Sequence, residues 1–163
     1  MRRPGENDDF RRKGTAVSAG KPTPHGRERY AAFRAVTTRY MDNDPYRHVN
    51  NAVYYSFFDT TVSGWLWEKG LVVPHQSDII GLVVSSSCDY FASVAFPDAI
   101  ECGLRVARIG NSSVQYGVGV FRQGASEAAA QGLFTHVYVD ARTSRPVALP
   151  AAFRDALQVL LRG

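Results

Sequence analysis

The sequence has few of the features that mark several large classes of protein. Only two of its 163 residues are cysteine, which is too few for a disulfide framework and fits no metal-binding spacing. No apolar run approaches the ~18 residues that a membrane-spanning helix needs. The first ten residues are rich in charge and contain no apolar core of a secretory signal. We therefore expect a reduced cytoplasmic protein without a membrane span.

An excess of basic charge is also missing from most of the chain. The net charge is +4, but residues 1–29 hold eight basic and four acidic side chains, and residues 30–163 balance at eleven of each. A nucleic-acid-binding face on the folded domain would leave basic residues in excess there, so we expect no nucleic-acid partner. Residues 1–29 also contain few apolar side chains. This composition predicts a tail that is disordered or loosely docked, followed by one domain over residues 30–163.

Several familiar catalytic motifs do not occur in the sequence. Gly117 and Gly119 begin a dinucleotide-binding fingerprint, but Arg122 stands where its last glycine belongs. The chain has no Walker loop and no Gly-x-Ser-x-Gly elbow. Its histidines and cysteines lack metal-ligand spacing, so we expect no metal and no other cofactor. We interpret His136, inside a predicted strand, as a structural histidine with hydrogen-bond partners.

The clearest element in the sequence is a long helix. Asn50 or Asn51 can cap its start, and Gly70 suits its C-terminal end. Val53 and Trp67 widen its apolar stripe, which indicates a helix largely surrounded by protein. The stripe falls at helical spacing on Tyr54, Phe57, Phe58, Thr61, Val62, Trp65 and Leu66.

The other predicted elements are mainly strands. Residues 31–40 form a first strand before the helix, and four β-rich segments follow it. These later segments are residues 79–94, 98–109, 112–123 and 127–140. Short turns join the last three, which predicts an antiparallel meander. Pro150 opens a terminal helix with one apolar face, formed by Phe153, Leu157, Leu160 and Leu161. One long apolar helix with one antiparallel sheet indicates an α+β fold in which the sheet wraps the helix.

A dense polar stretch leads into the long helix. Asp42, Asp44 and His48 precede its N-terminus, where unpaired backbone N–H groups and the helix dipole favour developing negative charge. A carboxylate and an imidazole beside such a site can act on an acyl carbonyl. The alternative is that both aspartates cap turns and that His48 is a surface loop residue.

The same stretch resembles the hotdog-fold thioesterases of the 4-hydroxybenzoyl-CoA thioesterase and acyl-CoA thioesterase group. The shared pattern is Asp42-Asn43-Asp44, then His48-Val49-Asn50-Asn51, then Tyr54 inside the helix. Weaker similarity extends over about residues 30–155 and includes Phe96-Pro97-Asp98 and Gly110-Asn111-Ser112-Ser113-Val114.

The resemblance implies a single hotdog domain with about five antiparallel strands around a central helix. It places the catalytic carboxylate on Asp44 and the backbone amide that polarises the thioester carbonyl on Asn51. His48 matches a motif histidine that is functional in some branches. The resemblance also implies an acyl-CoA or acyl-carrier-protein substrate and a homodimer or homotetramer. We expect substrate contacts at Tyr54, Phe58 and Ser113. Apolar walls for the acyl group are expected from Phe57, Phe58 and the strand from Gly81 to Tyr90, and the alternative is that these residues are only core.

Departures from the family pattern bear on the mechanism. Tyr46 stands where plant acyl-carrier-protein thioesterases have a functional asparagine, and only Arg108 is close to the turn that carries basic residues in the aromatic-CoA branch. Hotdog hydratases or dehydratases use an Asp and a His about five apart within an Asp-x-Asn-Pro-type motif, whereas Asp44 and His48 are four apart here and the Asn-Pro pair is missing. Besides a thioester hydrolase, a hydratase and a non-catalytic acyl-CoA-binding module remain alternatives.

Overall fold

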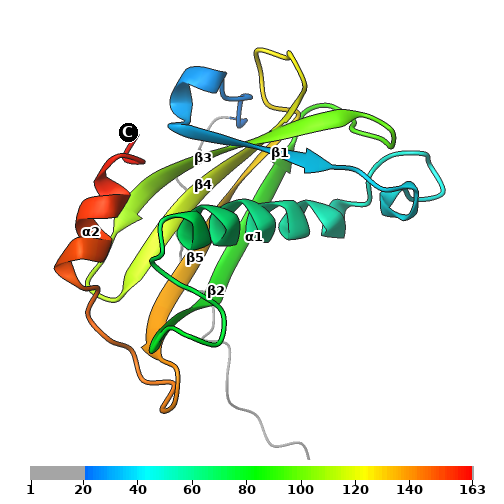
Figure 1. Cartoon of the computed structure of the whole chain (residues 1–163). Helices are drawn as coiled ribbons and strands as arrows, with labels where there is room; N and C mark the ends of the chain where they lie inside the picture. The colour runs from blue at the N-terminus through cyan, green and yellow to red at the C-terminus, as the bar shows by residue number, and fades with distance from the viewer. Residues whose placement is uncertain (1–20, 163) are drawn as a thin grey trace, which may run out of the picture.

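The computed structural model describes residues 21–162 (Figure 1). Within this range the chain forms five strands, two α-helices and two short 3₁₀ helices. In chain order these elements are η1 (Arg27–Arg29), β1 (Ala32–Thr37), η2 (Tyr40–Asp42), α1 (Asn51–Glu68), β2 (Ile79–Tyr90), β3 (Ala99–Ile109), β4 (Ser113–Arg122), β5 (Ala130–Asp140) and α2 (Ala151–Gln158).

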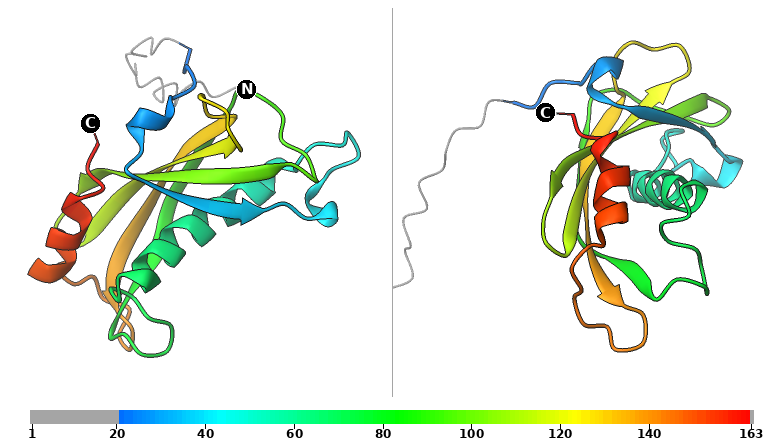
Figure 2. Two further views of the ribbon diagram at one scale, coloured as in Figure 1. Left: turned by 45° about the horizontal axis from the view of Figure 1, so that its top comes forward. Right: turned by 60° about the vertical axis from the view of Figure 1, so that its left-hand side comes forward.

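The five strands form one antiparallel sheet in the order β1-β3-β4-β5-β2. The predicted meander of the last three strands is therefore confirmed, and β1 and β2 are the two edges. The right view of Figure 2 looks nearly along α1 and shows the sheet curving around one side of it. This arrangement confirms the α+β fold with a sheet wrapped around a long central helix.

Helix α1 begins and ends where the sequence predicts. The Asn50 side chain accepts a hydrogen bond from the Ala52 N–H at 2.9 Å, and Gly70 ends the helix at a positive φ of 65°. All seven residues of the predicted stripe are buried. Trp67 is instead 51% exposed, so it does not widen the stripe as predicted. The sheet covers only one side of the helix, and α1 packs over β3 and β4.

Helix α2 lies beside the end of the sheet near β3 (Figure 1). Phe153 and Leu157 are buried, and the Phe153 ring packs against Tyr138 with ring centroids 4.8 Å apart. Leu160 is buried just beyond the helix. The predicted place of Leu161 on the same face is wrong, because the helix ends at Gln158 and Leu161 is partly exposed.

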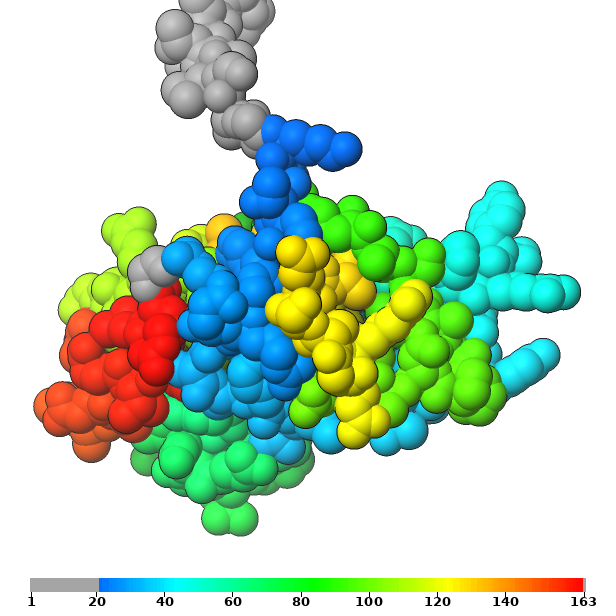
Figure 3. All heavy atoms as spheres, turned by 90° about the horizontal axis from the view of Figure 1, so that it is seen from above, coloured from blue at the N-terminus to red at the C-terminus, as the bar shows by residue number. Residues whose placement is uncertain are grey.

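Part of the predicted tail packs against the domain. The Gln131 side chain accepts a hydrogen bond from the His25 N–H and donates one to the Thr23 carbonyl. Arg27 pairs with Glu101 at 2.9 Å. Figure 3 shows this segment, in blue, between the C-terminal residues and the turn that follows β4. The part of the predicted tail from residue 21 onward therefore docks on the domain, and the boundary at residue 30 stays a prediction. Residues 1–20 lie outside the described residues, and the tail there stays a prediction.

Glycines on the outer face of the sheet explain why this segment docks. The Tyr30 ring lies over Gly103 and Gly119, and a Cβ on Gly119 would stand 2.5 Å from the Tyr30 hydroxyl. Tyr30 also packs edge-on against Phe121 at 5.5 Å. The Tyr30 ring thus fills the space that the two glycines leave on β3 and β4. It anchors a segment whose composition is otherwise polar.

His136 lies in the core between the rings of Phe134 and Tyr116, with ring centroids 4.9 and 5.4 Å away. It is buried, as predicted, but among the described residues neither ring nitrogen has a hydrogen-bond partner. The prediction that this histidine is hydrogen-bonded is therefore wrong. Because burial disfavours the charged ring, the pKa of His136 falls to about 4.

Candidate functional site

The residues between η2 and α1 form a narrow hairpin that carries Asp44. Asn43 and Val49 pair as an antiparallel bridge, and the Asp44 N–H donates to the His48 carbonyl at 2.8 Å. Arg47 closes the turn at a positive φ of 67°. The right-hand end of Figure 1 shows this hairpin beside the N-terminus of α1. The hairpin brings the polar motif of the sequence to the start of the helix.

The two aspartates of the motif have different environments. Asp42 is buried and accepts hydrogen bonds from the Arg39 N–H at 2.7 Å and from the Arg39 guanidinium at 2.8 Å. Asp44 is partly exposed, and its Oδ1 accepts from the N–H groups of Tyr46 at 2.8 Å and His48 at 3.3 Å. Asp42 thus closes the 3₁₀ turn, whereas Asp44 keeps its second carboxylate oxygen outside these bonds.

The first turn of α1 forms the other side of the site. Asn51 is the first helical residue, and the N–H groups of a first turn have no acceptor within their own helix. The Tyr90 hydroxyl, at the end of β2, donates to the Asn51 carbonyl at 3.2 Å. The Tyr90 ring meets Tyr54 edge-on, with centroids 5.1 Å apart. These contacts fix the start of the helix from the side of β2.

A surface hollow of about 380 Å³ joins these groups. Asp44, His48, Asn51 and Tyr54 all line it, so four of the predicted site residues lie together. The rest of the lining comes from Val49, Tyr90, Phe91, Ala92 and Ser93. Sequence reasoning missed only Phe91, Ala92 and Ser93, because they follow a strand that is separated from the motif by about forty residues.

Two predicted substrate contacts lie elsewhere. Phe58 is fully buried and packs against Phe134, so it belongs to the core and does not line the hollow. Ser113 begins β4 opposite Val137, whereas the residues beside the hollow adjoin the Tyr90–Ala130 end of the sheet. The described part of one chain therefore does not bring Ser113 to Asp44.

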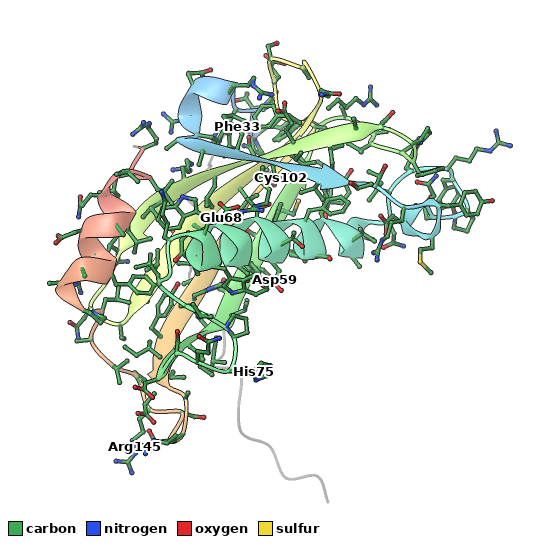
Figure 4. All side chains as sticks on the ribbon, viewed as in Figure 1. Phe33, Asp59, Glu68, His75, Cys102 and Arg145 are labelled. Carbon is green, nitrogen blue, oxygen red and sulfur yellow. The ribbon has the colours of Figure 1, made fainter. Side chains whose placement is uncertain are left out.

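Tyrosine and cysteine side chains near the hollow are held in their neutral forms. Burial raises the pKa of Tyr54 to about 12, and a hydrogen bond from the backbone of Val94 opposes this shift. Burial likewise raises the pKa of Cys88 to about 11. It raises the pKa of Cys102, a β3 residue labelled in Figure 4 that does not line the hollow, to about 12. The thiolate is the reactive form of cysteine, so neither thiol is prepared as a nucleophile.

Residues 21–162 contain no group of three or more histidine, cysteine or acidic side chains placed to hold a metal ion. Over the same residues, no helix combines the length and the apolar character that crossing a membrane requires. The polar side chains that line the hollow are the carboxylate of Asp44, the imidazole of His48, the phenols of Tyr54 and Tyr90, the carboxamide of Asn51 and the hydroxyl of Ser93.

Comparisons with known proteins agree with this geometry. A family model described as the thioesterase superfamily matches residues 46–129, which include His48, Asn51 and Tyr54 and begin just after Asp44. A crystal structure of a Pseudomonas aeruginosa PAO1 protein is 55% identical, with a TM-score of 0.83, and the match covers 86% of this chain and 99% of that one.

More distant structures carry functional descriptions. A Thermus thermophilus thioesterase, complexed with coenzyme A and Zn, is 27% identical with a TM-score of 0.65, over 82% of this chain and 96% of that one. A 1,4-dihydroxy-2-naphthoyl-CoA thioesterase from Synechocystis shares the fold at 16% identity and a TM-score of 0.69, over 77% of this chain and 94% of that one. No curated protein matches the chain.

Proposed function

The chain belongs to the thioesterase superfamily, and from this premise we propose that it hydrolyses acyl-CoA thioesters with Asp44 as the catalytic carboxylate. One observation carries the proposal: the Asp44 carboxylate and the first turn of α1 line the same hollow. Thioester hydrolysis needs both a nucleophile or base and stabilisation of the oxyanion that forms at the carbonyl.

The start of α1 supplies the oxyanion site in this proposal. The Asn51 N–H lies in the first turn, where the helix dipole favours negative charge. The Asn50 cap already occupies the Ala52 N–H. The thioester carbonyl would accept a hydrogen bond from Asn51 and would then face Asp44 across the hollow.

Asp44 is held for attack by its own loop. Its Oδ1 accepts hydrogen bonds from two backbone N–H groups, which leaves Oδ2 to act on substrate or water. The carboxylate then acts in one of two ways. It either attacks the thioester carbonyl and expels the thiolate, which leaves an anhydride that water hydrolyses, or it removes a proton from an attacking water, whose addition to the carbonyl is followed by loss of the thiolate. His48 lines the same hollow and would orient substrate or water rather than act as the main base.

Coenzyme A is the proposed carrier because the Thermus thermophilus thioesterase was crystallised with it. The acyl group would lie along the inner side of β2, on the same face of the sheet as α1. Tyr90 lines the hollow, and Cys88 and Val83 follow it toward the other end of the strand on the same side of the sheet. Val83 is 48% exposed, so this wall is open in a single chain.

We also propose that the protein works as a homodimer or as a dimer of dimers. β2 pairs only with β5, which leaves its other edge without a strand partner among the described residues. Leu82, Val83 and Val84 on this edge are 43%, 48% and 60% exposed. A long exposed apolar edge strand is a template for pairing with another chain, so a second copy of β2 is the proposed partner.

The central experiment measures thiol release from acyl-CoA substrates with a thiol-reactive dye. The panel runs from acetyl-CoA to palmitoyl-CoA and includes benzoyl-CoA and phenylacetyl-CoA. We expect Asp44→Asn to keep its fold and to lower kcat by about 10²–10⁴, the range typical of a positioned acid or base. Asp42→Asn is the matched control and should reduce kcat much less, because Asp42 closes the turn with Arg39.

Thiol release separates the proposal from its alternatives. A hydratase would change the acyl group without releasing thiol, and a binding module would bind acyl-CoA without turnover. A folded Asp44→Asn enzyme with near-wild-type kcat would falsify the role of Asp44. Release from acyl-carrier protein but from no acyl-CoA would contradict the proposed carrier.

A further inference from the structure

We propose that Asn43 is a positioning residue that holds the Asp44 carboxylate in place through the loop before β3. This inference rests on the proposed role of Asp44 and concerns a neighbour whose side chain does not line the hollow. The Asn43 Oδ1 accepts a hydrogen bond from the Phe96 N–H at 3.0 Å, across 53 residues of sequence. Asn43 directly precedes Asp44, so this bond acts on the backbone that carries the carboxylate.

The hairpin of Asp44 is tied to residues 93–98 on both of its arms. On one arm the Val49 N–H donates to the Val94 carbonyl at 2.7 Å, and on the other Asn43 accepts from Phe96. The Val49 bond uses only backbone atoms and is independent of the side chain. The Asn43 bond depends on one side-chain oxygen. A substitution of Asn43 can therefore release this arm of the hairpin from the loop before β3.

The loop that receives these bonds is itself braced. The Ala95 N–H donates to the Asp98 carboxylate at 3.0 Å, and the Arg122 guanidinium donates to the Ser93 carbonyl and lies 3.5 Å from the same carboxylate. Ser93 also lines the hollow. A braced loop gives Asn43 a fixed point, whereas a mobile one would not restrain Asp44.

Loss of this restraint should affect the chemical step more than substrate binding. The hairpin retains its Asn43–Val49 bridge and the Asp44–His48 bond without the side chain. The fold should therefore persist while the carboxylate samples a wider range of positions. Displacement of a reacting group by about 1 Å can cost on the order of a hundredfold in rate.

The test measures kcat and KM for acyl-CoA hydrolysis in Asn43→Ala, Asn43→Gln and Asn43→Asp. Alanine removes the acceptor, and glutamine moves it outward by one methylene. Both variants should lower kcat by about 10- to 100-fold with KM changed less than threefold. Aspartate keeps an oxygen acceptor at the same distance from the backbone, so Asn43→Asp should recover most of the lost kcat.

Thr38 provides a matched control on the same pair of loops. Its buried hydroxyl donates to the Asp98 carbonyl at 2.8 Å, six residues before Asp44. Thr38→Val should lower Tm and leave kcat within twofold. Equal kcat in wild type, Asn43→Ala and Asn43→Gln would overturn the inference, as would a kcat loss in Thr38→Val as large as that in Asn43→Ala. A wild-type protein that releases no thiol would instead contradict the proposed function itself.

Discussion

Strands β4 and β2 are similar in sequence character but differ sharply in burial. Both are rich in valine and small residues, and both lie in the same antiparallel sheet. In β4, Val114, Val118 and Val120 are completely buried, because β3 and β5 flank the strand and α1 crosses over it. In β2, Val83 and Val84 are about half exposed, because the strand lies at the edge and away from the helix.

The difference in burial shows that α1 covers only the centre of the sheet. α1 is long enough to cover β3 and β4, but the sheet curves past it and leaves the inner side of β2 open (Figure 2). The covered centre should carry most of the stability of one chain. The open edge should instead control how chains associate.

The largest expected effect is at the covered centre. Phe58 of α1 is fully buried and packs against Phe134 of β5, so Phe58→Ala should lower the free energy of unfolding by about 3–5 kcal/mol. Urea unfolding followed by circular dichroism would measure it. Trp67→Ala on the exposed side of the same helix is the matched control and should cost under about 0.5 kcal/mol. Similar losses in the two variants would contradict the difference in burial.

A second expected effect concerns His136, which is also at the covered centre. Its pKa is lowered to about 4 by burial, against 6.5 for the free side chain, so the unfolded chain binds the proton more readily. Stability should therefore be complete above pH 6.5 and should fall by up to about 3 kcal/mol as the pH drops to 4.

The variant His136→Phe keeps an aromatic ring but cannot bind a proton. Comparing its unfolding free energy with that of the wild type between pH 7 and pH 4 removes the contribution of the carboxylates. The wild type should lose more stability than the variant over this range. If the unfolding free energies of the two proteins change with pH in parallel, the lowered pKa of His136 is contradicted.

The smallest expected effect on the stability of one chain is at the open edge. Val83→Lys places a charge on the exposed part of β2 and should change the unfolding free energy of a monomer by under about 1 kcal/mol. The same change should prevent edge pairing. Light scattering should then give an 18.0 kDa species for the variant and a larger one for the wild type. A wild type that is fully active as a monomer would contradict the proposed dimer.

Sequence patterns predicted the elements well because their signals are local. The apolar side chains of α1 repeat at helical spacing, and all seven of the predicted core positions are buried. The exposure of Trp67 was not predictable in this way, because it depends on how far the sheet wraps the helix. The lack of hydrogen-bond partners at the ring nitrogens of His136 was not predictable either. It depends on how the sheet packs the rings of Tyr116, Phe134 and Tyr138 around this histidine.

The candidate site was predictable where it lies in one short stretch. Asp44, His48, Asn51 and Tyr54 span a single loop and the first turn of one helix, so local sequence places them together. Tyr90 joins them through the pairing of β2 with β5, and no local signal specifies that pairing. Within one chain Ser113 lies at another end of the sheet, because its distance from the hairpin depends on strand register.

The hydrogen bond from Tyr90 to Asn51 has a thermodynamic consequence. It connects the end of the edge strand to the helix turn that would hold the oxyanion. If a second chain pairs with β2, ordering of that strand and ordering of the helix start become linked equilibria. Linkage is reciprocal, so a ligand bound at the helix start must strengthen the association of two chains by the same factor by which association strengthens its binding. Ligand affinity would then depend on protein concentration.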